Sequence, residues 1–227
     1  MELINNFVDL FLHLDKHLSM VIQTYGSLTY IILFLIIFCE TGLVITPLLP
    51  GDSLLFAAGA MAATGALNIK ILLVLLFCAP LIGDQVNYWV GRFFGSQLFF
   101  KEDARFLKKA YIDKTHGFYN KYGGKTIIIA RFVPIVRTFA PFVAGLGKMN
   151  YLRFIAFSVV GALMWVGAFV LVGFFFGNIP IVKNNFTLAI MAIIGISLLP
   201  AIFEYVRQKT LIKKTIARKQ AAQVKEL

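Results

Sequence analysis

Four ionisable side chains stand inside apolar stretches of this sequence, namely Glu40, Asp52, Arg131 and Arg137. A charge near the middle of a bilayer costs about 2.5–3.5 kcal/mol, so such residues persist where they pair, line a watery cavity or handle a ligand. Arginine binds phosphate through a planar fork of donors, and a carboxylate shielded from water takes up a proton more readily. We therefore predict that Arg131 and Arg137 bind an anionic phosphate, while Glu40 and Asp52 carry protons.

A purely structural alternative stays open because the two acids balance the two arginines in charge. Two ion pairs would then clamp the segment that holds the acids to the segment that holds the arginines. Both interpretations apply together if the pairs hold a resting state and open for the substrate.

The composition identifies the surroundings of these charges. Of the 227 residues, 59% are hydrophobic and 15% are charged, and the mean hydropathy is +0.81. A soluble domain carries about 45–50% apolar and about 25% charged residues. These values exclude a soluble enzyme, a disordered chain and a disulfide scaffold, and they indicate an all-α polytopic membrane protein.

Four segments are long and apolar enough to span a bilayer as helices. They are residues 23–46, 69–90, 151–177 and 184–206. Residues 1–20 differ, because Phe7, Leu10, Phe11, Leu14 and Leu18 recur at three- and four-residue spacing among polar residues. This pattern predicts an amphipathic helix that lies in the membrane interface.

Two further apolar segments, 47–67 and 126–147, are interrupted by prolines and glycines. The interruptions with a predicted structural role are Pro47, Pro50, Gly51, Pro134, Pro141 and Gly145. Basic loops stay in the cytoplasm, and the regions 91–125 and 207–227 are the most basic. An even number of crossings must separate them, so we predict that 126–147 enters and leaves on one side as a re-entrant hairpin.

By analogy, 47–67 forms a re-entrant hairpin from the opposite face, and both termini are cytoplasmic. Paired interrupted segments of opposite direction are typical of transporters built from inverted repeats. We predict one membrane domain over residues 1–206, followed by the basic tail 207–227.

Asp84, Tyr88 and Arg92 recur at four-residue spacing and share one helix face. We interpret them as a structural clamp near the cytoplasmic interface, and Trp89 and Trp165 as interface anchors or packing groups.

Enzyme motifs are lacking, since Gly51-Asp52-Ser53 is not a nucleophile elbow and the sequence has no P-loop. The scattered histidines and the two cysteines predict neither a metal site nor a cofactor. The sequence has no RNA-binding or helix-turn-helix motif, so the prediction is a non-enzymatic protein that does not bind nucleic acid.

The motifs resemble the DedA family of bacterial inner-membrane proteins, which is related to the VTT-domain (SNARE-associated Golgi) proteins. The resemblance rests on Phe38-Cys39-Glu40-Thr41-Gly42-Leu43, on the stretch from Pro47 to Leu55, on Gly83-Asp84 with Gly91-Arg92, and on the stretch from Gly123 to Gly145. It implies a transporter that depends on the proton-motive force and returns undecaprenyl phosphate to the inner leaflet for envelope synthesis. It also implies that the four membrane charges are needed for function.

Three alternatives compete with a lipid-phosphate transporter. They are a proton-coupled exporter of small cationic drugs, a passive lipid scramblase, and a membrane scaffold that transports nothing. The sequence leaves the oligomeric state open, with a homo-oligomer as one alternative.

Overall fold

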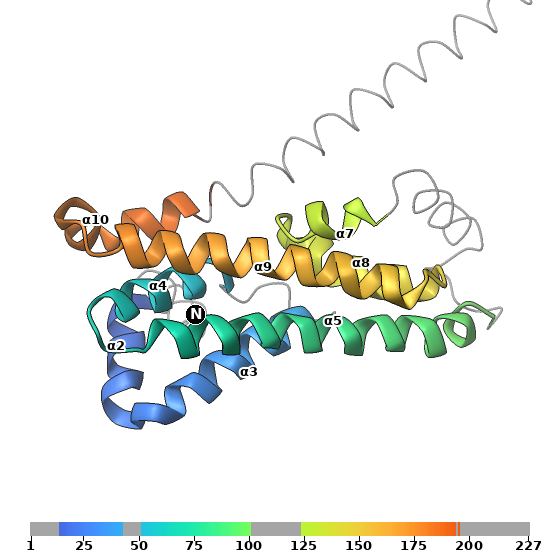
Figure 1. Cartoon of the computed structure of the whole chain (residues 1–227), viewed down its shortest axis with the longest axis horizontal. Coiled ribbons are helices and arrows are strands. Elements are labelled where there is room, and N and C mark those ends of the chain that lie inside the picture. The colour runs from blue at the N-terminus through green and yellow to red at the C-terminus, as the bar shows by residue number, and fades with distance from the viewer. Residues whose placement is uncertain (1–13, 43–50, 101–123, 194, 196–227) are drawn as a thin grey trace, which may run out of the picture.

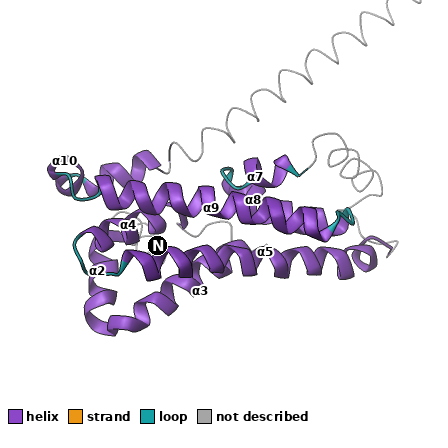
Figure 2. Cartoon of the chain, viewed as in Figure 1, coloured by secondary structure: helices purple, strands orange, loops and turns teal. Residues whose placement is uncertain are grey.

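Helices make up the regular secondary structure in the computed structural model, which describes residues 14–42, 51–100, 124–193 and 195 (Figures 1 and 2). In chain order the elements are α2 (Leu14–Tyr25), the short 3-10 helix η1 (Gly26–Leu28), α3 (Thr29–Gly42), α4 (Gly51–Ala63), α5 (Ile69–Phe100), α7 (Lys125–Ala130), α8 (Pro134–Leu146), α9 (Tyr151–Phe176) and α10 (Pro180–Asn184). Most of the predicted segments 1–20 and 91–125 and all of 207–227 lie outside the described residues.

Three stretches are long and apolar enough to cross a membrane, namely Lys16–Gly42, Ile69–Phe94 and Tyr151–Phe176. Large apolar side chains also point outward along them, such as Val74 on α5 and Leu163 on α9, which are 66% and 56% exposed. An apolar exterior of this kind suits a lipid surrounding. The prediction of an all-helical membrane protein is therefore confirmed.

The predicted spans correspond unevenly to the helices. Segments 69–90 and 151–177 match α5 and α9, although α5 continues to Phe100. Of the predicted span 184–206, residues 184, 186–193 and 195 are helical, and most of the rest lies outside the described residues.

The N-terminal helices meet at a different residue from the one the sequence predicts. We predicted a boundary between 20 and 23, whereas α2 continues to Tyr25 and the chain bends at η1. Gly26 there has a φ of 51°, which glycine adopts at little cost. Leu14 and Leu18 are buried in the main core, and α2 contacts α4. The apolar face of α2 thus packs against protein.

The long helices α5 and α9 run in opposite directions. Asp84 of α5 is hydrogen-bonded to Ser158 of α9, and Tyr88 of α5 stacks on Phe154 of α9 with 4.4 Å between ring centroids. The two helices are therefore antiparallel.

The two 13-residue helices, α4 and α8, each pack along the long helix from the other half of the chain (Figure 1). Asp52 and Ala60 of α4 meet Trp165 and Gly177, in the same order, so α4 is parallel to α9. In the same way α8 is parallel to α5, and α3 and α7 pack on α5 and α9 respectively. The segments α3–α5 and α7–α9 thus have equivalent but opposed arrangements.

Glycines allow the helices to approach closely at the two equivalent crossings. Gly59 and Gly173 lie where α4 meets α9, and Gly91 and Gly145 lie where α5 meets α8. A Cβ atom on any of them would stand 1.9–2.1 Å from a carbonyl oxygen of the facing helix, which is much closer than van der Waals contact. Small residues at such crossings are a general feature of membrane helix packing.

We expect Gly173→Ala to destabilise the protein, because the new methyl group would overlap the carbonyl oxygen of Phe56 at 2.1 Å. Overpacking costs about 1–3 kcal/mol, which corresponds to a fall in Tm of roughly 2–10 °C. Gly167→Ala on the same helix is the control, since a Cβ there meets nothing within 4 Å. Thermal unfolding in detergent measures both variants. An equal Tm for the two would contradict the close crossing.

Candidate functional site

Arg137 on α8 lies at the centre of a buried cluster formed by four helices. Its Nη2 donates to Oε1 of Glu40 on α3, and its Nη1 donates to Oδ1 of Asp52 on α4 at 2.8 Å. Trp165 on α9 completes the arrangement, because its Nε1 donates to the same Asp52 oxygen at 2.9 Å. The guanidinium carbon also lies 4.6 Å from the centroid of the indole ring, a cation–π geometry. We call these four residues the Arg137 centre.

The first turn of α4 adds backbone donors to this centre. The helix begins at Gly51, whose N–H donates to Oε1 of Glu40 at 3.2 Å. The N-terminus of a helix attracts negative charge, so α4 helps to hold the carboxylate. A Cβ atom on residue 51 would stand 1.7 Å from the other Glu40 oxygen. Glycine is therefore required for the carboxylate to approach.

Arg131 forms a second buried centre in the turn between α7 and α8. Its Nη2 donates to Oδ2 of Asp84 on α5 and to Oγ of Ser158 on α9 at 3.3 Å. The Ser158 hydroxyl in turn donates to Asp84. Asp84 and Arg131 have only 2% and 3% of their surface exposed. We call these three residues the Arg131 centre.

The structure therefore pairs the charges differently from the sequence prediction. Glu40 and Asp52 both bind Arg137, and neither has a hydrogen bond to Arg131 among the described contacts. Arg131 binds Asp84, which the sequence grouped with Tyr88 and Arg92. The roles predicted for the four charges stay predictions, but the pairing needs Asp84 as a fifth member.

Of the predicted clamp of Asp84, Tyr88 and Arg92, only the contact between Tyr88 and Arg92 is present. Arg92 donates to the Tyr88 hydroxyl at 2.9 Å, and that hydroxyl donates to the carbonyl oxygen of Met149 at 2.6 Å. Asp84 shares their helix face but contacts Arg131 and Ser158 instead. Residues one turn apart share a face of the helix. They lie at different positions along its axis, however, and therefore contact different neighbouring residues.

Three polar residues of the site were missed or interpreted differently from the sequence. Trp165 is buried in the core, which fits the packing alternative and not the interface anchor, and its bond to Asp52 was not predicted. Nor was a role for Ser158. Asn87 also went unnoticed, although its amide donates to the carbonyl oxygens of Thr41 at 2.6 Å and Thr138 at 3.4 Å. The position of Trp165 in the middle of an apolar span, away from both interfaces, was the available signal.

The prolines and glycines with a predicted structural role lie at different positions in the helices. Pro134 is the first residue of α8, where its missing N–H costs nothing. Pro141 lies inside α8, and Gly145 lies at the crossing with α5. Pro47 and Pro50 lie outside the described residues.

A narrow crevice, too tight in this structure for a water molecule, is lined by residues from both centres. Its lining residues are Asp84, Ile127, Arg131, Arg137, Ala140 and Pro141. Nη1 of Arg131 and Nε of Arg137 are buried and have no hydrogen-bond partner among the described residues. Buried donors normally have partners, so the N–H groups of these two nitrogens are available to donate hydrogen bonds to a ligand's oxygen atoms.

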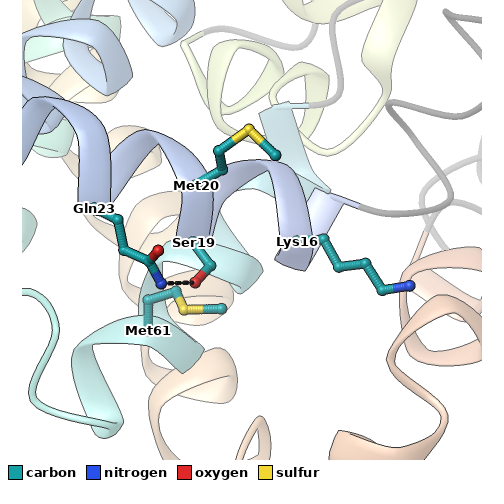
Figure 3. A pocket seen from close by; sticks show the side chains of 5 residues that line it. All are labelled: Lys16, Ser19, Met20, Gln23 and Met61. Carbon is teal, nitrogen blue, oxygen red and sulfur yellow. Dashed lines mark hydrogen bonds between the residues drawn. The ribbon is translucent and has the colours of Figure 1, made fainter.

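A roomier pocket elsewhere has one cationic side chain, Lys16, and neither of the two buried arginines. It measures about 440 Å³ and lies between α2 and α4 (Figure 3). Its lining residues are Lys16, Ser19, Met20, Gln23 and Met61, and the Gln23 amide donates to the Ser19 hydroxyl at 3.4 Å. Neither arginine of the two centres lines it, so the narrow crevice is the better candidate site.

Comparison with known proteins identifies the family. The VTT domain matches residues 49–175. Protein DedA of Escherichia coli K12 is 54% identical over 211 residues, which cover 92% of this chain and 96% of DedA. The chain belongs to the DedA family. The resemblance seen in the motifs is thus confirmed.

Two further relatives in this family are also described as membrane proteins. An uncharacterized membrane protein of Mycobacterium tuberculosis H37Rv, Rv0364, is 45% identical over 81% of both chains. The inner membrane protein YqjA of Escherichia coli K12 is 34% identical over 68% of this chain and 70% of YqjA. No solved structure gives a significant match.

The Arg131–Asp84 pairing can be tested by a double-mutant cycle. Breaking a buried ion pair by removing one partner costs about 3–5 kcal/mol, because the other charge is left buried. We therefore expect Asp84→Asn and Arg131→Gln each to lower the free energy of unfolding. The double variant should lose less unfolding free energy than the two single variants lose in sum. Unfolding in detergent gives the three free energies.

The control cycle combines Glu40→Gln with Arg131→Gln. These residues belong to different centres, so their effects should add within about 0.5 kcal/mol. A coupling as large as that of Asp84 with Arg131 would contradict the pairing.

Proposed function

We propose that this protein moves an anionic lipid phosphate, with undecaprenyl phosphate as the candidate substrate, between the leaflets of the bacterial inner membrane, driven by the proton-motive force. The proposal rests chiefly on one observation. Arg137 is a buried guanidinium held by two carboxylates, and it lines the same crevice as Arg131.

Two arginines on one crevice suit a phosphate headgroup. Each guanidinium can donate two parallel hydrogen bonds to phosphate oxygens. The charged side chains that line the crevice are two arginines and one acid, Asp84, so a drug cation would meet a net positive charge there. The crevice is narrow, so a headgroup needs the centres to open, while a polyprenyl chain can remain in the lipid.

Protons enter the scheme through competition for Arg137. As long as Glu40 and Asp52 hold its Nη1 and Nη2, these nitrogens cannot bind a phosphate. A protonated carboxyl group attracts the guanidinium far less than a carboxylate does. Proton uptake by the acids therefore releases Arg137 for the substrate, which couples the two events.

The helix lengths support the proposal of re-entrant hairpins. Helices α4 and α8 have 13 residues each, which corresponds to about 20 Å, whereas the hydrocarbon core is about 30 Å thick. We propose that the hairpins of α4 and of α7–α8 enter from opposite faces, with both termini cytoplasmic. Alternate movement of the two would expose the crevice to each side in turn.

Proton coupling also suits the energetics of an inward-moving phosphate. The inside of the cell is negative, so each negative charge carried inward costs about 2.3 kcal/mol per 100 mV. Protons carried with the phosphate cancel that charge and add the pH gradient as a driving force.

The proposal can be tested with purified protein in vesicles that contain a fluorescent polyprenyl phosphate. We expect transfer between leaflets to depend on an imposed proton gradient. Arg137→Ala should lower the rate at least about 30-fold, because truncating one member of a buried charge pair costs about 2 kcal/mol or more. Arg153→Ala is the control, since that arginine is exposed on α9.

Other results point to other functions. Transfer that is indifferent to the gradient would indicate a scramblase. Absence of transfer by folded wild-type protein would leave drug export, to be measured with cationic dyes, or a scaffold role. If reversing the charges of both partners in a pair restored full transport, the charges would be a clamp only.

A further inference from the structure

The two centres together contain an unequal number of acids and bases. The carboxyl groups belong to Glu40, Asp52 and Asp84, and the guanidinium groups belong to Arg131 and Arg137. All five are within the protein, with Asp52 the most accessible at 12% of its side-chain surface. If all were ionised, the cluster would carry one negative charge in excess.

Charge balance therefore indicates where a proton already resides. An uncompensated charge buried in apolar surroundings is strongly unfavourable, and the group neutralises instead. Asp84 has Arg131 to itself, whereas Glu40 and Asp52 share Arg137. For the closed arrangement to be electrically neutral, one proton would have to be shared between Glu40 and Asp52.

Asp84 competes for Arg131 in the same way that Glu40 and Asp52 compete for Arg137. The groups that face it are Arg131 and Ser158 in direct contact and Arg137 across the crevice. Ser158 can donate to the carboxylate, and it can accept a hydrogen bond from the protonated acid. Asp84 thus retains a hydrogen-bond partner both when it is ionised and when it is protonated. A buried acid needs such a partner if it is to release its arginine.

We infer that Asp84 is a third proton-binding residue, and that binding of a phosphate monoester takes up as many protons as the phosphate has negative charges. This inference rests on the proposed function. A dianionic headgroup that takes both arginines leaves all three acids without a counter-ion, so two further protons must bind. A monoanionic headgroup leaves one acid ionised, so one proton binds.

The exchange is electroneutral in both cases. The membrane potential then neither drives nor opposes it, and the pH gradient supplies the driving force. If Asp84 were a fixed counter-ion of Arg131, only one carboxylate would remain to be neutralised, and a dianion would carry net charge.

The test measures protons taken up per ligand by full-length protein in detergent. Farnesyl phosphate is the probe, and calorimetry in two buffers of different ionisation enthalpy gives the number. At about pH 8 the headgroup is mainly dianionic, because its second ionisation lies near pH 6. We expect about two protons per bound ligand at pH 8, falling toward one at about pH 5.

A charge-balanced variant isolates the contribution of Asp84. The double variant Asp84→Asn with Arg131→Gln removes one acid and one base together, so only one ionised acid is left. We expect uptake at pH 8 to fall to about one proton, with weaker binding. The control Arg92→Gln lies outside both centres, and it should keep the wild-type number.

The outcomes separate the inference from the proposed function. No binding of farnesyl phosphate to folded wild-type protein would overturn the proposed function. Binding with one proton or none at pH 8, in both the wild type and the double variant, would overturn only the role of Asp84. In vesicles, electroneutral exchange predicts transfer that responds to a pH gradient and ignores a potassium diffusion potential.

Discussion

The contact of Arg137 with Glu40 and Asp52 is the interaction on which the rest of the structure depends. One guanidinium joins α3, α4 and α8, and through Trp165 it also reaches α9. None of these charges can lie alone in an apolar interior, so the helices that carry them have to meet. The glycine at position 51 follows from the same constraint, because a larger residue would displace the Glu40 carboxylate.

The close helix crossings make that contact reachable. With glycine at both sides of each crossing, α4 lies directly on α9 and α8 lies directly on α5. Any larger residue at Gly59 or Gly145 would push the short helix outward and carry Asp52 or Arg137 away from its partners. The charge pairing therefore depends on the close helix packing, and both involve residues far apart in the sequence.

The sequence predicts the class of fold and the buried charges well, and the partners of those charges poorly. Apolar length alone identifies α5 and α9, and the cost of burying charge identifies Glu40, Asp52, Arg131 and Arg137. Partner choice depends on the depth at which each residue lies once the helices pack, which spacing does not give. For this reason Asp84 was grouped with Tyr88 one turn away, although it meets Arg131 from a distant part of the chain.

The same limit applies to residues whose role comes from one neighbour. Trp165 would be an ordinary packing residue if Asp52 did not lie beside it. The spacing of the apolar residues in 1–20 likewise did not predict the bend at Gly26. The burial of Leu14 and Leu18 and the contacts of α2 with α4 show that α2 packs against α4.

The two halves of the molecule share geometry but divide the chemistry between them. The two halves can be aligned by pairing their crossing glycines, Gly59 with Gly145 and Gly91 with Gly173. In this alignment the position of Asp52 corresponds to Thr138, and that of Asp84 corresponds to Val166. The acids of the two centres thus all lie in the first half, α3–α5, and the arginines both lie in the second half, α7–α9. Every ion pair of the site joins one half to the other. The halves therefore cannot move apart without separating charges in an apolar interior, and neutralising the acids removes that barrier. If the acids take up protons as proposed, no separate device is needed to link protons to movement, because the same groups form the contacts between the halves.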